Sequence, residues 1–244
     1  MFAAFPQLLF KLFLAVNIRL LIYYLMCGRY CLTTSKSQIN EQFRADSSEN
    51  SEITRYNIAP SNQILTIVAT DQGKQAQWMK WGLIPSWVKD LDSWKGNLIN
   101  ARSETVAQKP SFRQAFQQRP CLIPASGFYE WSKKQPYYFH SAESIFAFAG
   151  IWDKWVDSSG TGGEIFSCTI LTTKAQGTIE SVHHRMPLVL QPASYDAWLG
   201  SVEQRVKLLG NLDANQTSLK MYPVHKMVNS PRNDSPDCIQ PMSA

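Results

Sequence analysis

The sequence lacks any Pro-, Ser- or Gly-rich linker and any break in composition after Met26, and it contains no internal repeat. Nothing in it therefore divides the chain into two domains. Charged residues are also few: they make up 18% of the 244 residues, whereas apolar residues make up 44%. A chain of this length and composition can bury one sizeable core. We predict a single globular domain.

Neither the net charge nor the cysteines identify a ligand on their own. The formal net charge is +5, but Lys11 and Arg19 lie in the first 25 residues, where no acid does, and the chain from Met26 carries +3. So small an excess does not by itself predict nucleic-acid binding, which needs a local basic cluster. The five cysteines are odd in number and scattered, so we expect reduced cytosolic thiols rather than disulfides. Cys27 and Cys31 could form half of a zinc site, but no second cysteine pair or histidine pair follows at zinc-finger spacing, so we expect no metal.

The first 25 residues are apolar, yet they fit neither a membrane span nor a secretory signal. Their apolar run is interrupted by Lys11, Asn17 and Arg19, and a central Arg alone costs about 2.5–3.5 kcal/mol on insertion scales. A charged start and a small-residue cleavage site are both lacking. Three interpretations stay open: a misassigned start codon, a removable propeptide, or a membrane anchor. We favour the first, because it requires only that Met26 be the true initiator.

Many short strands and few helices, without strand–helix–strand alternation, predict an α+β fold. After a leader over residues 1–25, we expect one domain over residues 26–230, with a mainly antiparallel, barrel-like sheet flanked by short helices, and a frayed tail over residues 231–244. Apolar periodicity and turn residues place the individual elements. Strand pairs are predicted at 64–69 with 75–81 and at 145–155 with 165–172, and helices at 35–43, 110–116, 195–199 and 202–209, with a further helix opening at 100–104.

The segment Met26-Cys27-Gly28-Arg29 carries the most distinctive chemistry of the chain. If translation starts at Met26, the small second residue allows the initiator Met to be removed, and Cys27 becomes the mature N-terminus. A terminal cysteine has a thiol and an α-amine on adjacent carbons, and this pair can close a five-membered thiazolidine ring on an aldehyde. The amine has an ordinary pKa of about 7.7–8.0, so a useful fraction of it is neutral at physiological pH. Behind the upstream residues Cys27 has no amine, so the start site decides whether this chemistry is available.

Five further blocks stand out, although none is a general catalytic motif by itself. They are residues 56–60 (YNIAP), 81–87 (WGLIPSW), 100–104 (NARSE), 127–131 (GFYEW) and 183–187 (HHRMP). Together with Met26–Tyr30, and in this order, they resemble the SRAP (SOS response-associated peptidase) family from Met26 to about Val228. The departures are the leader and His184, where many relatives have an acid.

The resemblance implies that the protein shields abasic sites in single-stranded DNA covalently, as part of the DNA damage (SOS) response. Cys27 would form the thiazolidine with the ring-opened sugar, with associated strand incision (lyase activity) and slow reversal. Asn100 would orient the amine or the opened sugar hydroxyl. Glu130 would be the general acid and base, with a pKa raised by its aromatic neighbours. His183 would move protons at the sugar oxygens.

The resemblance also implies a DNA-binding groove. Arg29, Arg102 and Arg185 would contact phosphates through their guanidinium groups. Trp81, Trp87 and Trp131 are candidates to stack on bases, although we expect at most two of the three to touch DNA and the rest to lie in the core. No cofactor or metal is required, and we expect a monomer in the cytoplasm, associated with the nucleoid when crosslinked.

Two other functions stay open on the sequence. The first is a thiol peptidase, in which His183 activates Cys27 and the leader is removed by self-cleavage. The second is a non-catalytic module that binds single-stranded DNA or is tethered to a membrane by the leader. It predicts salt-sensitive binding without a covalent product.

Overall fold

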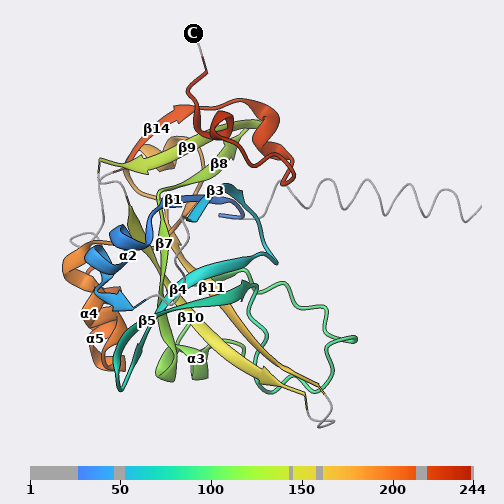
Figure 1. Cartoon of the computed structure of the whole chain (residues 1–244), viewed down its shortest axis with the longest axis vertical. Helices are drawn as coiled ribbons and strands as arrows, with labels where there is room; N and C mark the ends of the chain where they lie inside the picture. Colours follow the sequence, from blue (N-terminus) through green and yellow to red (C-terminus); the bar gives the residue numbers. More distant parts are fainter. Residues whose placement is uncertain (1–26, 47–52, 143–144, 158–161, 213–218, 243–244) are drawn as a thin grey trace, which may run out of the picture.

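A closed five-stranded barrel forms the centre of the fold (Figure 1). The computed structural model describes residues 27–46, 53–142, 145–157, 162–212 and 219–242, so the leader lies outside the described residues. Successive strands round the barrel are antiparallel, and a parallel pairing between the last and the first closes it, at Trp81 opposite Cys168. The predicted α+β fold with a barrel-like, mainly antiparallel sheet is confirmed. In order round the barrel the strands are β11 (Glu164–Lys174), β10 (Phe146–Val156), β7 (Pro120–Ala125), β4 (Gln63–Thr70) and β5 (Gly73–Trp81).

Four short strands extend the sheet of the barrel. β6 runs parallel to β11, and β12 pairs with the same strand in the antiparallel sense. β13 pairs with β10, and β2 runs parallel to β5. Their bounds are β2 (Ala45–Asp46), β6 (Asn100–Arg102), β12 (Arg185–Pro187) and β13 (Val189–Leu190).

A second, antiparallel sheet lies above the barrel in Figure 1. Tyr30 of this sheet joins it to the barrel, because its ring makes edge contacts with Trp81 and Phe148 at centroid distances of 5.4 and 5.7 Å. One hydrophobic core therefore serves both sheets. In spatial order the strands are β14 (Leu219–Pro223), β9 (Gln135–Ser141), β8 (Gly127–Ser132), β1 (Tyr30–Thr34) and β3 (Ile53–Ile58).

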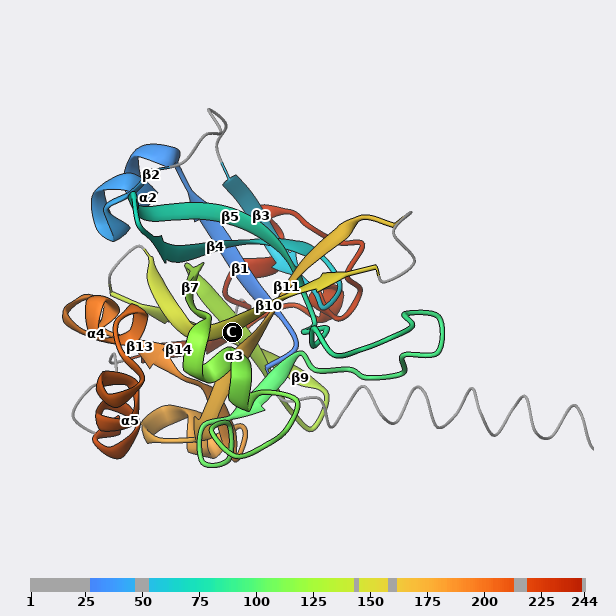
Figure 2. The same ribbon diagram turned by 90° about the horizontal axis from the view of Figure 1, so that it is seen from below.

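Short helices cover the barrel, and several start where the sequence predicts. Ser35 and Ser201 each cap a helix through a reciprocal bond with a Gln three residues later. Figure 2 shows α2, α4 and α5 on one side of the barrel and the chain between β5 and β6 extending from the other. The helices are α2 (Lys36–Phe43), α3 (Arg113–Gln118), α4 (Tyr195–Leu199) and α5 (Val202–Gly210), with 3-10 turns η2 (Gly177–Ser181), η3 (Pro192–Ser194), η5 (Lys226–Asn229) and η6 (Pro236–Ile239).

Two segments differ from the sequence prediction. Asn100–Arg102 forms strand β6 rather than opening a helix, because it pairs with Ile170–Thr172 of β11. The segment expected to fray is packed where it is described, over residues 231–242: Cys238 is fully buried and Met242 donates its N–H to the Pro223 carbonyl. The described part of the chain contains no helix with the length and apolar character needed to cross a bilayer.

Candidate active site

The backbone of Cys27 lies between a carboxyl and an amide. Its N–H donates to Glu130 Oε1 at 2.8 Å, and Asn100 Nδ2 donates to its carbonyl oxygen at 3.4 Å. Cys27 is fully buried and has φ of +35°, a conformation that non-glycine residues rarely adopt. In this chain the nitrogen is an amide joined to Met26; without Met26, the same position would hold the terminal amine.

Strand register explains why Glu130 meets Cys27. β1 and β8 pair antiparallel with Tyr30 opposite Phe128, and the Tyr129 N–H donates to the Arg29 carbonyl at 3.0 Å. Continuing this register brings the residues just before Arg29 opposite Glu130. Asn100 comes from a different sheet, on β6. The site therefore forms where the second sheet meets the strands that extend the barrel.

Burial sets the proton affinity of Glu130. The residue is 2% exposed, and burial raises the pKa of its carboxyl to about 8, although the bond from the Cys27 N–H opposes the shift. The predicted raised pKa is confirmed. At neutral pH this carboxyl is mostly protonated and can donate a proton to a group at the position of the Cys27 nitrogen.

The thiol of Cys27 has the opposite character from an activated nucleophile. Burial, and then the charge of Glu130, raise the pKa of this thiol well above its ordinary value. A thiolate is therefore disfavoured. The geometry favours chemistry that begins at the nitrogen of Cys27.

His183 lies just before β12 and is half-buried. Its Nδ1 lies 3.0 Å from the Arg185 carbonyl and 3.1 Å from the Arg185 backbone nitrogen, so it donates to the carbonyl when protonated and accepts from the N–H when not. Burial lowers the pKa of His183, the backbone contact to Arg185 opposes this, and the neighbouring His184 and Arg185 add to the lowering. Strand β11 pairs with β6, which carries Asn100, and with β12, which begins two residues after His183.

The three predicted phosphate contacts lie in different environments. Arg102 is exposed and, two residues after Asn100 on β6, shares its face of the strand. Arg29 is 8% exposed, and its hydrogen-bond partners among the described residues are neutral, Asn57 Oδ1 at 2.7 Å being one of them. Arg185 is buried and forms a two-pronged ion pair with Glu104, which compensates its charge.

The three predicted base-stacking tryptophans also differ in how exposed they are. Trp81 is fully buried and donates its indole N–H to the Ile99 carbonyl at 2.9 Å, so no face of its ring is open to a base. Trp87 is 53% exposed and contacts Trp94 edge-on. Trp131 is partly exposed, next to Glu130, and donates to Asn229 Oδ1 at 2.7 Å. Stacking on DNA is therefore open to Trp87 and Trp131, and Trp81 belongs to the core.

Sequence reasoning missed Asn229 and Asp234. Asn229 contacts Arg29 and Trp131, and Asp234 contacts the backbone of Tyr56 and Asn57. Both lie in a polar C-terminal stretch without apolar periodicity, so no local pattern indicated their partners. Within the described ranges, no three His, Cys, Asp or Glu side chains gather as a possible metal site.

Comparison with known proteins identifies the family to which this fold and the buried Cys27–Glu130 contact belong. The chain belongs to the SOS response associated peptidase (SRAP) family, whose profile matches residues 26–231. It is similar to the abasic site processing protein YoqW of Bacillus subtilis (strain 168), with 37% identity over 227 residues, which cover 88% of this chain and 99% of YoqW. It is also similar to the abasic site processing protein HMCES of Gallus gallus, with 32% identity over 191 residues, 67% of this chain and 56% of HMCES.

Solved structures share the fold. A crystal structure of a protein from Bacteroides thetaiotaomicron superposes with a TM-score of 0.75 at 24% identity, over 89% of this chain and all of the other. One from Bordetella bronchiseptica gives a TM-score of 0.70 at 25% identity, over 82% of this chain and all of the other.

Proposed function

We propose that this protein processes abasic sites in DNA by covalent capture at Cys27. The observation that carries the proposal is the Cys27 nitrogen held 2.8 Å from the buried carboxyl of Glu130. An amine at that position would be in contact with Glu130, which can both donate a proton and accept one. The names of its relatives, abasic site processing proteins, describe what those proteins act on and support the same substrate here.

The capture proceeds as a condensation. The terminal amine of Cys27 attacks the aldehyde of the opened sugar and forms a carbinolamine. Glu130 donates a proton to the hydroxyl, which leaves as water, and the resulting carboxylate takes the proton from the nitrogen, so that a neutral imine remains. The thiol then adds across the imine, its proton passing to the nitrogen, to close the thiazolidine. Burial raises the pKa of Glu130 above its ordinary value, which brings the proton affinity of the carboxyl nearer to that of an amine and favours exchange of a proton between the two groups.

The remaining site residues have supporting roles. Asn100, which already donates to the Cys27 carbonyl, orients the reacting end of the chain. His183 moves protons at the sugar oxygens, which serves ring opening, reversal of the crosslink and strand incision from the same imine. Its lowered pKa keeps the ring neutral and able to accept a proton near neutral pH.

The surface that would contact DNA combines cations with aromatic side chains. Exposed Arg102 contacts a phosphate directly, whereas buried Arg29, with neutral partners only, adds positive potential beside Cys27. Trp87 and Trp131 stack on bases, which requires unpaired DNA. Single-stranded substrate, action as a monomer and a cytoplasmic location stay predictions from the sequence.

The mature chain begins at Cys27 under this proposal. The family match starts at residue 26, and the site is built around the Cys27 nitrogen. The peptidase alternative needs a thiolate, and the raised pKa of the Cys27 thiol disfavours one. We therefore place the amine first in the reaction.

A denaturing gel shift tests the proposal. Single-stranded DNA with one abasic site is incubated with two forms of the protein, full-length and starting at Met26. We expect a heat-stable adduct from the Met26 form, whose initiator is removed, and none from a full-length form that keeps residues 1–26. Mass spectrometry of the N-terminus verifies both forms. Adduct from neither would rule out covalent capture, and adduct from an intact full-length chain would rule out the terminal amine.

A further inference from the structure

A β-bulge lies in the edge strand next to the site. Two residues of β3, Tyr56 and Asn57, face one residue of β1, Cys31, because the register shifts between Tyr30 and Leu32. Such a bulge removes backbone groups from the ladder and redirects side chains. β3 is the last strand in its sheet, so the outer N–H groups of the bulge need partners other than a strand.

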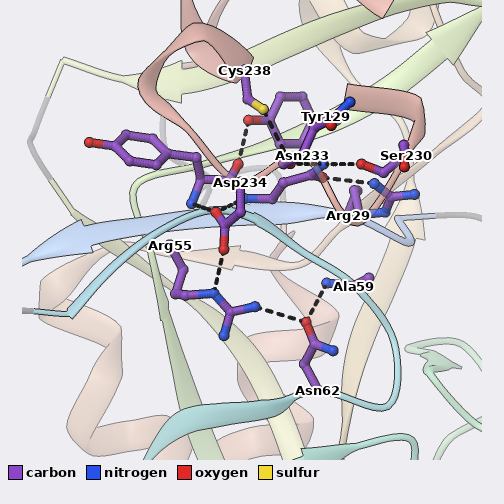
Figure 3. Close-up of polar contacts among 11 residues, drawn as sticks. Arg29, Arg55, Ala59, Asn62, Tyr129, Ser230, Asn233, Asp234 and Cys238 are labelled. Atoms are coloured by element: carbon purple, nitrogen blue, oxygen red, sulfur yellow. Dashed lines mark hydrogen bonds and ion pairs between the residues drawn. The ribbon is translucent and has the colours of Figure 1, made fainter. Parts of the chain in front are cut away.

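The carboxylate of Asp234 supplies those partners (Figure 3). Its Oδ1 accepts the N–H groups of Tyr56 and Asn57 at 2.5 and 3.0 Å. Its Oδ2 accepts from Arg55 Nε at 2.7 Å. One side chain of the C-terminal segment (residues 228–242) therefore accepts hydrogen bonds from three successive residues of β3.

The bulge directs the Asn57 side chain at the C-terminal segment and at Arg29. Asn57 is 1% exposed, and its Oδ1 accepts from the Arg29 guanidinium at 2.7 Å. The guanidinium also donates to the Val228 carbonyl at 2.7 Å. Asn57 Nδ2 lies within hydrogen-bonding distance of three backbone carbonyls, those of Val228 at 3.1 Å, Ser230 at 3.0 Å and Asn233 at 2.7 Å.

The bulge contacts residues that lie next to both reacting groups in the sequence, the Cys27 nitrogen and the Glu130 carboxyl. Arg29, held by Asn57, follows Cys27 by two positions. Tyr129, which precedes Glu130, donates its hydroxyl to the Tyr56 carbonyl at 2.6 Å. A shift of the bulge would therefore displace β8, which carries the carboxyl, and the residues just before β1, which carry the amine.

We propose that Asp234 and Asn57 are positioning residues, which fix the separation of the Cys27 nitrogen from the Glu130 carboxyl by holding the β3 bulge against Arg29 and Tyr129. The inference rests on the proposed function, because the reaction whose rate it sets is covalent capture. It assigns the C-terminal segment a role in reactivity, beyond covering the sheet.

The contacts also predict which atoms matter. Arg55 and Asp234 form an ion pair whose side chains are 39% and 28% exposed, and such pairs contribute little. We expect the N–H groups that Asp234 accepts, and the side-chain amide of Asn57, to hold the bulge in place instead. Arg55→Gln is therefore a matched control, because it removes the ion pair and leaves the cap. Asp237→Ala is a second control, an exposed acid of the same segment that contacts Ser235.

The experiment measures capture and binding separately, with the protein that starts at Cys27. The first-order rate of adduct formation is measured at saturating abasic single-stranded DNA. The dissociation constant is measured with DNA that carries tetrahydrofuran, which has no aldehyde, in place of the abasic sugar. We expect Asp234→Ala and Asn57→Ala to lower the rate by about tenfold or more, because small displacements of reacting groups are costly, and to change the dissociation constant by less than about twofold. Arg55→Gln and Asp237→Ala should keep the wild-type rate.

Conservative variants separate positioning from a loss of folding. Asp234→Asn keeps one oxygen for the two N–H groups, so we expect it to recover most of the rate lost in Asp234→Ala. If Asp234→Ala does not fold, Asn57→Ser carries the test, because it leaves Asp234 and the capped N–H groups in place. All rates are compared well below the melting temperature of each variant. Equal rates for active wild type, Asn57→Ser and Asp234→Ala would overturn the positioning role alone, whereas wild type without adduct would overturn the proposed function itself.

Discussion

Glu130 shows at the residue scale how burial turns an ordinary carboxyl into a proton donor for neutral pH. It is 2% exposed on β8, and its carboxyl accepts a hydrogen bond from the backbone nitrogen of Cys27. Desolvation therefore dominates, and the pKa rises to about 8 from an ordinary 4.5. A buried acid with this pKa lowers the stability of the folded state once the pH exceeds its ordinary pKa, because the unfolded chain then gives up the proton and the folded chain keeps it.

That cost predicts a pH dependence of stability in the full-length chain, in which the Cys27 nitrogen is an amide. Between pH 4.5 and about 8 the unfolded chain has lost the Glu130 proton and the folded chain keeps it. Wild type should therefore lose stability relative to Glu130→Gln as the pH rises through this window, by at most about 1.4 kcal/mol per pH unit. Urea unfolding of both proteins from pH 4 to pH 9 checks this. A flat difference would show that Glu130 has an ordinary pKa, and a difference of the opposite sign would show that its pKa is lowered in the folded state.

The same substitution should slow capture in the protein that starts at Cys27. Gln keeps the shape of Glu130 but cannot donate a proton to the leaving hydroxyl or accept one from the amine. We expect the rate of adduct formation to fall by about 10²–10⁴-fold. Single-turnover gel assays measure it, with Glu104→Gln, which changes an acid that is paired with Arg185, as the comparison. An unchanged rate in Glu130→Gln would remove Glu130 from the proposed mechanism.

At the scale of elements, short helices are held in place by one buried arginine. Arg205 of α5 is 1% exposed and donates to four backbone carbonyls, two beside the end of α3 and two near the end of α4. These carbonyls are among those that a helix leaves unpaired at its C-terminus. Helices of five and six residues are not stable alone, so this connection fixes them against the barrel.

Arg205→Ala should therefore destabilise the fold severely. Four carbonyls would lose their donor together, which we expect to cost about 3 kcal/mol or more in free energy of unfolding. Arg205→Lys should recover little, because an ammonium cannot reproduce the planar fork. Lys207→Ala, at an exposed position on the same helix, should change stability by less than about 0.5 kcal/mol. Chemical denaturation measures all three, and a loss in Arg205→Ala as small as in Lys207→Ala would contradict the role.

At the scale of the whole molecule, the barrel and the second sheet form one folding unit. Tyr30 and Phe128 of the second sheet contact Phe148 of the barrel, at centroid distances of 5.7 and 5.9 Å. The proposed active site lies at this junction, with Glu130 from the second sheet, Cys27 just before β1 of that sheet, and Asn100 from β6 beside the barrel. Neither sheet could hold the site by itself.

We therefore expect a single unfolding transition for the protein that starts at Met26. Far-ultraviolet circular dichroism, which follows the strands and helices, and tryptophan fluorescence, which includes Trp81 and Trp198 in the core, should give the same denaturant midpoint. Two separated midpoints would show that the sheets unfold independently, and the site would then be lost with the less stable one.

The sequence by itself determined the local features of this protein. The apolar periodicity of 35–43 and of 75–81 depends on neighbours along the chain, and the predicted helix and strand are both confirmed. The aromatic neighbours of Glu130 likewise predicted its burial and raised pKa. Six ordered blocks were specific enough to identify the family.

Tertiary structure decided what depends on residues distant in the chain. Asn100–Arg102 is a strand because β11 pairs with it, 70 positions further along at Ile170. Trp81 lies in the core, and the charge of Arg185 is compensated by Glu104. The residues next to them in the sequence do not distinguish this tryptophan and this arginine from the exposed Trp87 and Arg102. The packing of residues 231–242 depends on the free N–H groups of a bulge in an edge strand, and such groups exist only once β1 and β3 have paired.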